Sequence, residues 1–289
     1  MSVGNSVRVA IELECSAIKV GNVHPLASFR DLNHAQFVSA AKAIGDSVDN
    51  SNSQSVGDIV LKSVQAMILA VGTNTSLGTI LLMAPLVVAT NHLVTNRTLT
   101  NRMGSVEDHQ RKLKANVHQA LSNLTPEDSH NIYEAIRTAR PGGLGVSKSM
   151  DLRDPAPENI LDAMKLAADR DDIALQYMTD FELVFSIARR LEIKQASGLS
   201  DLDSIRCIQV ELLSERVDSL IARKQGLEMA KRVQLRADEV LAAGPYASHK
   251  YEVAWHRLDK TLRDEEHLGN PGTIADLIAA ALVLVRRTG

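Results

Sequence analysis

Apolar residues recur at the spacing of an α-helix along most of the chain, and short polar or glycine-containing segments separate the runs. This spacing predicts amphipathic helices that bury one face. One such helix would be capped by Asp31 and closed by Gly45, followed by a polar connection at 46–57 and a helix at 58–69. After a polar region, further helices are expected at 113–124, 127–140, 158–168, 171–193, 201–221, 226–243 and 248–263.

No alternation of apolar and polar residues is long enough to require a sheet, so the expected fold is all-α. Aromatic residues make up only 3% of the chain, whereas strand-rich proteins usually contain more of them. The 289 residues suffice for one multi-helix globular domain spanning 1–289. Its longest irregular segment, 140–158, is a glycine-containing loop of the kind that forms active sites. In the final helix, Thr273 and Asp276 have the spacing of a capping box.

Charge and hydropathy exclude several classes of protein. A net charge of -3 gives no electrostatic footprint for nucleic acid or for an anionic membrane. No uncharged apolar run reaches the roughly 20 residues that span a bilayer, and the first residues do not have the pattern of a signal peptide. Cys15 and Cys207 show no metal-binding spacing and are expected to be free thiols in a reducing compartment. We therefore expect a cytoplasmic protein.

The segment from Gly72 to Gly78 places small and polar residues directly before the most apolar run of the chain. A helix N-terminus offers N–H groups without intrahelical partners and a partial positive charge, which suit an anion. Glycines at both ends would let a ligand approach the backbone. The polar side chains between them are Thr73, Asn74, Thr75 and Ser76. The other interpretation is an N-cap of a buried central helix that Pro85 kinks. Phosphate contact and capping both stay open here.

The segment KVGNVHPLASFRD brings Lys19, Asn22 and His24 together near Gly21 and Pro25, which break regular structure. A cation, an amide and an imidazole close in space can bind a phosphorylated ligand. The alternative is a loop whose polar groups face water.

The segment RPGGLGVSKSMDLRDP has glycines that could fold into a nest of N–H groups for phosphate, among them Gly142 and Gly143. Asp151 and Asp154 follow, and either carboxylate could hold Mg²⁺ near that phosphate. A disordered loop is the alternative.

Two further charged pairs occur at predicted helix ends. Asp171 and Asp172 lie at a helix start, where acids suit the helix dipole but could also hold a divalent metal. Arg223 and Lys224 lie at a helix end, where cations suit the dipole but could also contact phosphate.

In order and spacing, these segments resemble the triphosphoribosyl-dephospho-CoA synthase family (CitG/MdcB-like). They read KVGNVHPLASFRD, GTNTSLGTILLMAPL, RPGGLG, RDDIALQYMTDF, DSLIARKQG and NPGTIADLIAAAL, from about Lys19 to the C-terminus. The resemblance implies an all-helical transferase that moves the triphosphoribosyl group of ATP to 3′-dephospho-CoA. In that reaction C1 of the ATP ribose joins a ribose hydroxyl of the acceptor, and adenine leaves.

The resemblance also implies roles for the candidate residues. Positive charge builds on the ribose as its bond to adenine breaks, so a nearby carboxylate would stabilise it. A triphosphate needs Mg²⁺ together with N–H or cationic partners. The expected catalytic residues are Asp171, Asp172 and His24. The expected metal ligands are Asp151, Asp154, Asp171 and Asp172. The expected substrate contacts are Lys19, Asn22, Gly72, Thr73, Asn74, Thr75, Ser76, Gly142, Gly143, Arg223 and Lys224. The expected partners are ATP and dephospho-CoA or a related cofactor precursor, and a homodimer is left open.

The chain departs from relatives tied to citrate lyase at one position. They carry a His-Lys pair after Asn-Thr, where this chain has Ser76 and Leu77. Losing a cation from a triphosphate site could cost roughly 1–3 kcal/mol. Val20 also replaces a proline that is frequent in the family, so the chain resembles a divergent TNTxLG branch. Two alternatives therefore stay open. One is a related ATP-dependent step in making a one-carbon cofactor of the tetrahydromethanopterin or methanofuran type. The other is a helical nucleotide-binding protein without activity.

Overall fold

The computed structural model describes residues 1–51, 55–100, 106–142, 149–263 and 268–288. Within them it contains fourteen α-helices, which confirms the all-α prediction. No helix among these residues is both long enough and apolar enough to cross a membrane. The helices are α1 (Val3–Ser16), α2 (His34–Asp49), α3 (Val56–Val71), α4 (Leu77–Thr100), α5 (Val106–Ser122), α6 (Pro126–Ala139), α7 (Ile160–Ala167), α8 (Asp172–Met178), α9 (Glu182–Ala196), α10 (Asp201–Glu215), α11 (Ser219–Gln225), α12 (Leu227–Ala242), α13 (His249–Leu262) and α14 (Gly272–Thr288).

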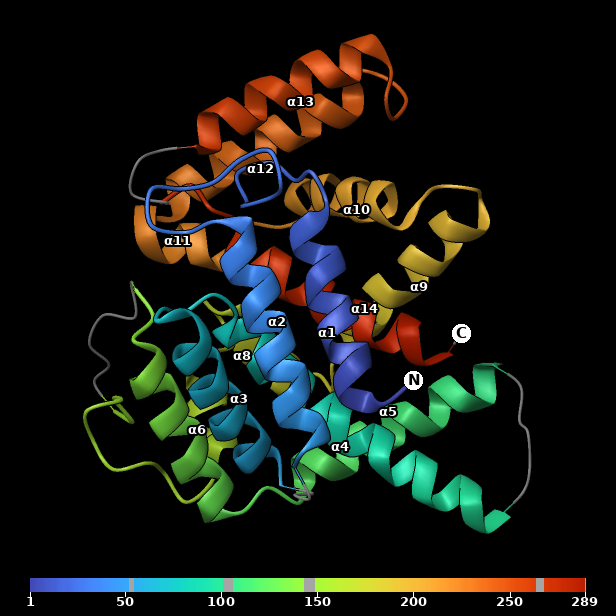
Figure 1. Cartoon of the computed structure of the whole chain (residues 1–289). Helices are drawn as coiled ribbons and strands as arrows, with labels where there is room; N and C mark the ends of the chain where they lie inside the picture. Colours follow the sequence, from blue (N-terminus) through green and yellow to red (C-terminus); the bar gives the residue numbers. More distant parts are fainter. Residues whose placement is uncertain (52–54, 101–105, 143–148, 264–267, 289) are drawn as a thin grey trace.

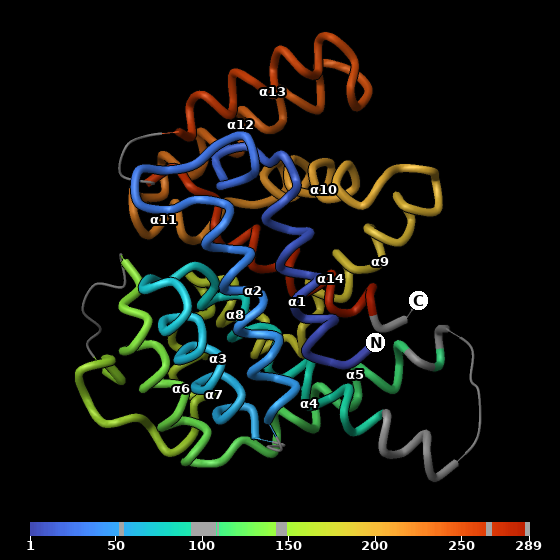
Figure 2. The backbone as a smooth tube through the Cα atoms, viewed as in Figure 1, coloured from blue at the N-terminus to red at the C-terminus, as the bar shows by residue number. Residues whose placement is uncertain are grey.

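The helices form layers around two apolar helices, α4 and α14. Figure 1 shows α1 and α2 side by side, with α3 and α6 next to them, α4 and α5 as a hairpin, and α12 and α13 at the outer edge. Helix α14 packs against α1, α4 and α9, so the first and last helices of the chain are neighbours (Figure 2). Residues 79–90 of α4 and 277–284 of α14 are buried without interruption. A helix that is apolar on every side requires such a central place.

Several helix boundaries differ from the sequence prediction. The N-terminal helix α1 was not expected. Helix α2 is capped by Asn33 rather than Asp31 and runs on through Gly45 to Asp49, into the predicted polar connection. The polar region at 95–112 is partly helical, because α4 extends to Thr100 and α5 begins at Val106.

Two long predicted helices are each divided into two. The helix expected at 171–193 breaks between α8 and α9, where Asp180 and Phe181 take left-handed φ angles of 48° and 64°. The buried Gln176 accepts hydrogen bonds there from Leu183 N and Val184 N, so a side chain caps α9. The helix expected at 201–221 breaks before Asp218, which caps α11. At the first break Gln176 bonds to residues seven and eight positions further along, and at the second Asp218 caps the helix that follows it. The spacing of apolar residues alone does not reveal either break.

The helices α1 and α2 touch through glycine. A Cβ atom added at Gly4 would lie 2.1 Å from the carbonyl oxygen of Gly45, and one added at Gly45 would lie 2.7 Å from that of Gly4. Both glycines are inside helices, where glycine is normally unfavourable relative to alanine. The close approach of the two backbones is therefore the reason for glycine at both positions.

Replacing Gly45 by alanine tests this packing. Helix propensity alone would stabilise the variant by about 1 kcal/mol. We expect the opposite, a loss of about 1–3 kcal/mol in the free energy of unfolding, because the methyl group forces the two helices apart. Urea denaturation measures the change, with Lys42→Ala on the exposed face of α2 as the control. An increase in stability for Gly45→Ala would show that the backbones do not touch.

Candidate active site

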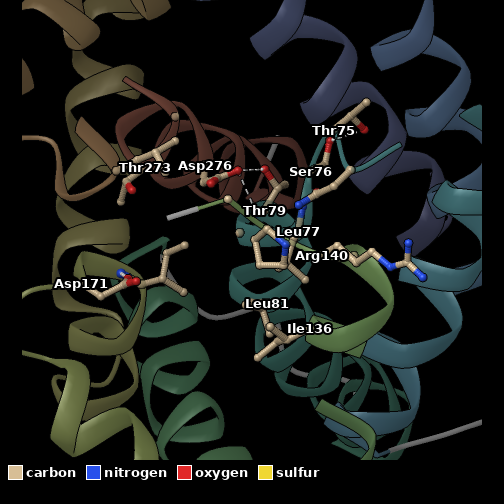
Figure 3. A pocket seen from close by; sticks show the side chains of 18 of the residues that line it. Thr75, Ser76, Leu77, Thr79, Leu81, Ile136, Arg140, Asp171, Thr273 and Asp276 are labelled. Atoms are coloured by element: carbon tan, nitrogen blue, oxygen red, sulfur yellow. Dashed lines mark hydrogen bonds between the residues drawn. The ribbon is translucent and has the colours of Figure 1, made fainter. Parts of the chain in front are cut away.

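A cavity of about 1170 Å³ lies where several helix ends meet. Its wall is built from the loop after α1, the α3–α4 connection, the C-terminal end of α6, helix α7, and parts of α8, α11 and α14. Figure 3 shows Asp276 turned toward Thr79, with Asp171 on one side of the cavity and Arg140 on the other. Residues from almost the whole length of the chain thus contribute to one space, so the fold brings distant segments together here.

The Gly72–Ser76 segment lines the cavity with every one of its residues. Gly72 ends α3 at a left-handed φ of 72°, a conformation that glycine adopts without strain. The side chain of Asn74 accepts a hydrogen bond from Leu77 N, at 3.1 Å, and so caps α4. The capping interpretation is confirmed. Contact with phosphate remains a prediction, and the position of the segment on the cavity wall is compatible with it.

Asp171 lies on the wall and already has partners for both oxygens. Its Oδ1 accepts from Ile173 N and Ala174 N at the start of α8, and its Oδ2 lies 3.0 Å from Nη1 of Arg223. Arg223 and Lys224 line the cavity from the end of α11. Asp171 therefore fixes the position of a guanidinium group at the cavity wall.

Asp172 does not line the cavity. Its carboxylate pairs with Arg216 at 3.1 Å, and burial raises its pKa although the guanidinium acts in the opposite direction. Its backbone N–H donates to the hydroxyl of Ser219. The two adjacent acids therefore differ in position, which their spacing in the sequence could not show.

The loop after α1 places Lys19 and Asn22 on the wall and His24 outside it. Lys19 is only 1% exposed, and its Nζ lies 2.8 Å from Oε1 of Glu14. Burial, together with the charge of Arg263 at 3.0 Å, lowers the pKa of His24 to about 4, so this imidazole is neutral at pH 7. The position of His24 does not support the catalytic role expected of it.

Asn22 is held by its neighbours on both sides. Its Nδ2 donates to Oδ1 of Asn270 at 2.6 Å, and its Oδ1 accepts from Nε2 of Gln209 at 2.6 Å. The amide therefore ties the loop to the segment that precedes α14.

The segment after α6 is partly described. Gly142 lines the cavity, and Gly143 lies outside the described residues. Asp151 also lines it and accepts a hydrogen bond from Nε of Arg153 at 2.7 Å, whereas Asp154 does not reach the wall. Within the described part of the chain, no group of three or more His, Cys, Asp or Glu side chains could hold a metal ion. The four expected metal ligands therefore do not form one cluster.

Several residues that line the cavity were not among those expected from the sequence. Asp276 was interpreted as part of a capping box, but α14 begins at Gly272 and the Asp276 carboxylate contacts α4 instead. A single acid within the apolar run IADLIAAALVLV was the signal for a special role. Arg140 and Arg170 also line the cavity and are exposed to solvent. Each is the first residue of a segment already singled out in the sequence, RPGGLG and RDDIALQYMTDF, but attention there fell on the glycines and the acids and not on the arginines.

The cavity also has an apolar part. Side chains of α4, α6 and α7 supply it: Leu81, Ile136, Ile160, Ala163 and Met164. A space lined by arginines on one side and by aliphatic groups on another suits a ligand with charged and apolar parts.

Two comparisons with known proteins found matches. A family model described as ATP:dephospho-CoA triphosphoribosyl transferase, CitG, matches residues 1–288. The crystal structure of a candidate triphosphoribosyl-dephospho-CoA synthase from Archaeoglobus fulgidus has a similar fold, with a TM-score of 0.57 and 22% sequence identity. The similarity covers 87% of this chain and 97% of that chain. No curated protein matches.

The two comparisons contribute different information. At this level of identity the structural similarity establishes the all-helical fold, whereas the family model covers nearly the whole sequence. The one-carbon cofactor enzyme and the inactive binding protein gain no support from either. The chain therefore belongs to the family of ATP:dephospho-CoA triphosphoribosyl transferases.

Proposed function

We propose that this cavity holds ATP and 3′-dephospho-CoA together and acts as a pentosyltransferase between them. Family membership supplies the overall reaction, in which the triphosphoribosyl group of ATP moves to 3′-dephospho-CoA. The observation that carries the assignment to this cavity is its uneven charge. Arginines and a lysine line the parts from α6, α8 and α11, while hydroxyls and a carboxylate line the part from α4 and α14.

The size of the cavity suits two substrates. Most small-molecule sites enclose roughly 300–1,000 Å³, and this cavity has about 1170 Å³. ATP and dephospho-CoA are both nucleotides with long charged chains, and the acceptor also carries an extended uncharged arm. The apolar part between Leu81, Ile136 and Met164 is the place we assign to that arm.

The triphosphate is assigned to the cationic side. Arg223 is positioned by Asp171, and Arg140 and Arg170 reach the same cavity from neighbouring loops. Guanidinium groups bind phosphate through two parallel N–H donors, which makes them suitable partners for a polyphosphate. These arginines offer positive charge in a chain that has Ser76 and Leu77 where some relatives have histidine and lysine. Thr73 and Thr75 add hydroxyl donors.

Magnesium is assigned to the triphosphate rather than to a resident site. Mg²⁺ is usually held by one or two carboxylates together with substrate phosphates. Asp151 and Asp171 are oxygen donors on the wall and would contact such an ion, which would neutralise phosphate charge. Each of these carboxylates already contacts an arginine, which agrees with a shared role in arranging charge around the phosphates.

The transfer requires a bond from C1 of the ATP ribose to a hydroxyl oxygen of the acceptor. As the bond to adenine breaks, positive charge develops on the ribose, and a carboxylate nearby stabilises it. Carboxylates on the cavity wall satisfy this electrostatic demand.

The reaction itself gives the first test. Pure protein with ATP, Mg²⁺ and 3′-dephospho-CoA should release adenine, and the acceptor should gain the mass of a triphosphoribosyl group. Liquid chromatography with mass detection measures both products. The control omits dephospho-CoA, which removes the attacking hydroxyl and should suppress adenine release. Absence of both products with intact, folded protein would overturn the proposal.

Removal of divalent metal gives a second test. EDTA should stop adenine release, because the triphosphate would enter the cavity without its counter-ion, and added Mg²⁺ should restore the rate. Undiminished turnover in EDTA would exclude a role for magnesium.

Asp171→Asn tests the positioning of Arg223. Asparagine is as good an N-cap as aspartate, so the circular dichroism spectrum should stay helical. The pairing with Arg223 loses its charge, and a hydrogen bond between charged groups contributes about 1.5–3 kcal/mol. We expect kcat/KM for ATP to fall roughly 10- to 150-fold. Asp46→Asn, which removes an exposed carboxylate paired with Lys42, is the control. Equal activity of both variants would remove Asp171 from the site.

A further inference from the structure

The carboxylate of Asp276 is held in one orientation by α4. Its Oδ1 accepts a hydrogen bond from Thr79 N at 2.9 Å and another from Thr79 Oγ1 at 2.6 Å. Two donors on one oxygen fix the carboxylate plane, and the second oxygen, Oδ2, lies beside Gly78. Asp276 lines the cavity, and Figure 3 shows it facing the start of α4.

The start of α4 is shaped around this carboxylate. A Cβ atom added at Gly78 would lie 2.1 Å from Oδ2 of Asp276 and 2.7 Å from its Cγ. Any other residue at position 78 would therefore displace the carboxylate. The φ of Gly78 is not among the left-handed glycine values, so close approach of Asp276 is the reason for glycine here.

Asp276 differs from the neighbouring acids in its partners. Glu14 is paired with Lys19, Asp151 with Arg153, and Asp171 with Arg223. Within the described part of the chain, no lysine or arginine forms an ion pair with Asp276. A carboxylate without a counter-charge repels a polyphosphate in the same cavity, so its presence needs a chemical reason.

Resting on the transfer proposed above, we propose that Asp276 is the base that takes the proton from the attacking hydroxyl of the acceptor. The hydroxyl oxygen forms a bond to C1 of the ATP ribose, and its proton moves to the Asp276 carboxylate. The bond between C1 and the adenine nitrogen breaks, and its electron pair stays on adenine. Adenine leaves after taking up one proton, and Asp276 returns to its ionised form when it gives its proton up. Thr79 is the positioning residue that aims the carboxylate.

The environment of Asp276 suits a base that works near neutral pH. Burial raises its pKa from 3.8 to about 7, and the charges of Glu14 and Asp218 add to the rise, while both hydrogen bonds from Thr79 oppose it. A general base is most effective when its pKa lies near the working pH. From α1 it is faced by Glu14 with Lys19 and from the start of α11 by Asp218, and α4 has no charged residue between Leu77 and Thr90. At the start of α8, Asp171 is paired with Arg223 and Asp172 with Arg216.

A raised pKa also has a cost in stability. Because the pKa is higher in the folded chain than in the unfolded one, ionisation of Asp276 opposes folding. Asp276 therefore lowers the free energy of unfolding least below about pH 4, where its carboxyl group is protonated in both states. The free energy of unfolding decreases as the pH rises toward 7. A base kept at the expense of stability is typical of catalytic groups.

Asp276→Asn is the decisive variant. Asparagine keeps an oxygen that can accept both bonds from Thr79 but cannot take a proton. We expect kcat to fall about 100- to 10,000-fold while KM for ATP and for dephospho-CoA changes little. The melting temperature of the variant at pH 8 should equal or exceed that of the unmodified protein. Between pH 4 and 7 the melting temperature of the variant should change less than that of the unmodified protein.

Thr79→Val supports the test if the first variant does not fold. Valine has the shape of threonine and keeps the backbone N–H, but loses the hydroxyl that lowers the pKa of Asp276. The acidic limb of the pH profile of kcat/KM should therefore move to higher pH. A purely structural role of Thr79 would lower the rate at every pH without moving the limb, and that result would overturn the proposal.

The outcomes separate this inference from the proposed transfer. If the unmodified protein releases no adenine, the transfer itself is wrong. If it does and Asp276→Asn keeps nearly full kcat, another group is the base and the transfer stands. If Asp276→Asn raises KM for ATP with kcat unchanged, Asp276 contacts substrate without moving a proton, and the proposal is overturned.

Discussion

The structure depends on one buried carboxylate that joins two helix starts. Asp218 accepts from Leu220 N and Ile221 N at the beginning of α11, and its other oxygen accepts from Ile274 N in α14 at 2.9 Å. The side chain is 1% exposed, and burial raises its pKa to about 6, so the three N–H donors are what keep it ionised at neutral pH. Next to it, the Ser219 hydroxyl donates to Thr273 and accepts from the start of α8. The starts of α8, α11 and α14 are therefore fixed relative to one another before any ligand binds.

The same principle organises the rest of the cavity. Most acids on its wall are bound to a particular cation or backbone N–H, so their charges have defined directions rather than freedom to rearrange. Groups held in this way need no reorganisation when a charged substrate enters, which is how an enzyme lowers the cost of reaching the transition state. Arg137 extends the arrangement, because its guanidinium donates to the carbonyl oxygens of Leu152 and Asp154 and so fixes the chain around Asp151. The folded chain, and not the solvent, thus fixes the positions of the charged side chains around the cavity.

The sequence predicted the fold class well because helical periodicity is local. It also predicted that the Gly72–Ser76 segment starts a buried helix, since a cap followed by an apolar run is a local pattern. It failed where contacts between distant residues decide the outcome. Gly45 is glycine because Gly4 of α1 approaches it and not because a helix ends there, and the carboxylate of Asp276 binds α4 and not its own helix. In the site, Lys19, Asp171 and Arg223 do reach the cavity. Asp172 and His24 do not, because their direction depends on partners far along the chain.

The central place of α14 has a consequence for biosynthesis. This helix is the last of the described helices to leave the ribosome, yet α1, α4 and α9 all pack against it. Until it arrives, the side of α4 that packs against α14 has no cover, and the nascent chain is vulnerable to aggregation during that interval. The packing of α14 against α1 also makes the last folding step slow, because segments far apart in the sequence must come together before any apolar surface between them is buried. Completion of the core and completion of the cavity are thus a single late event.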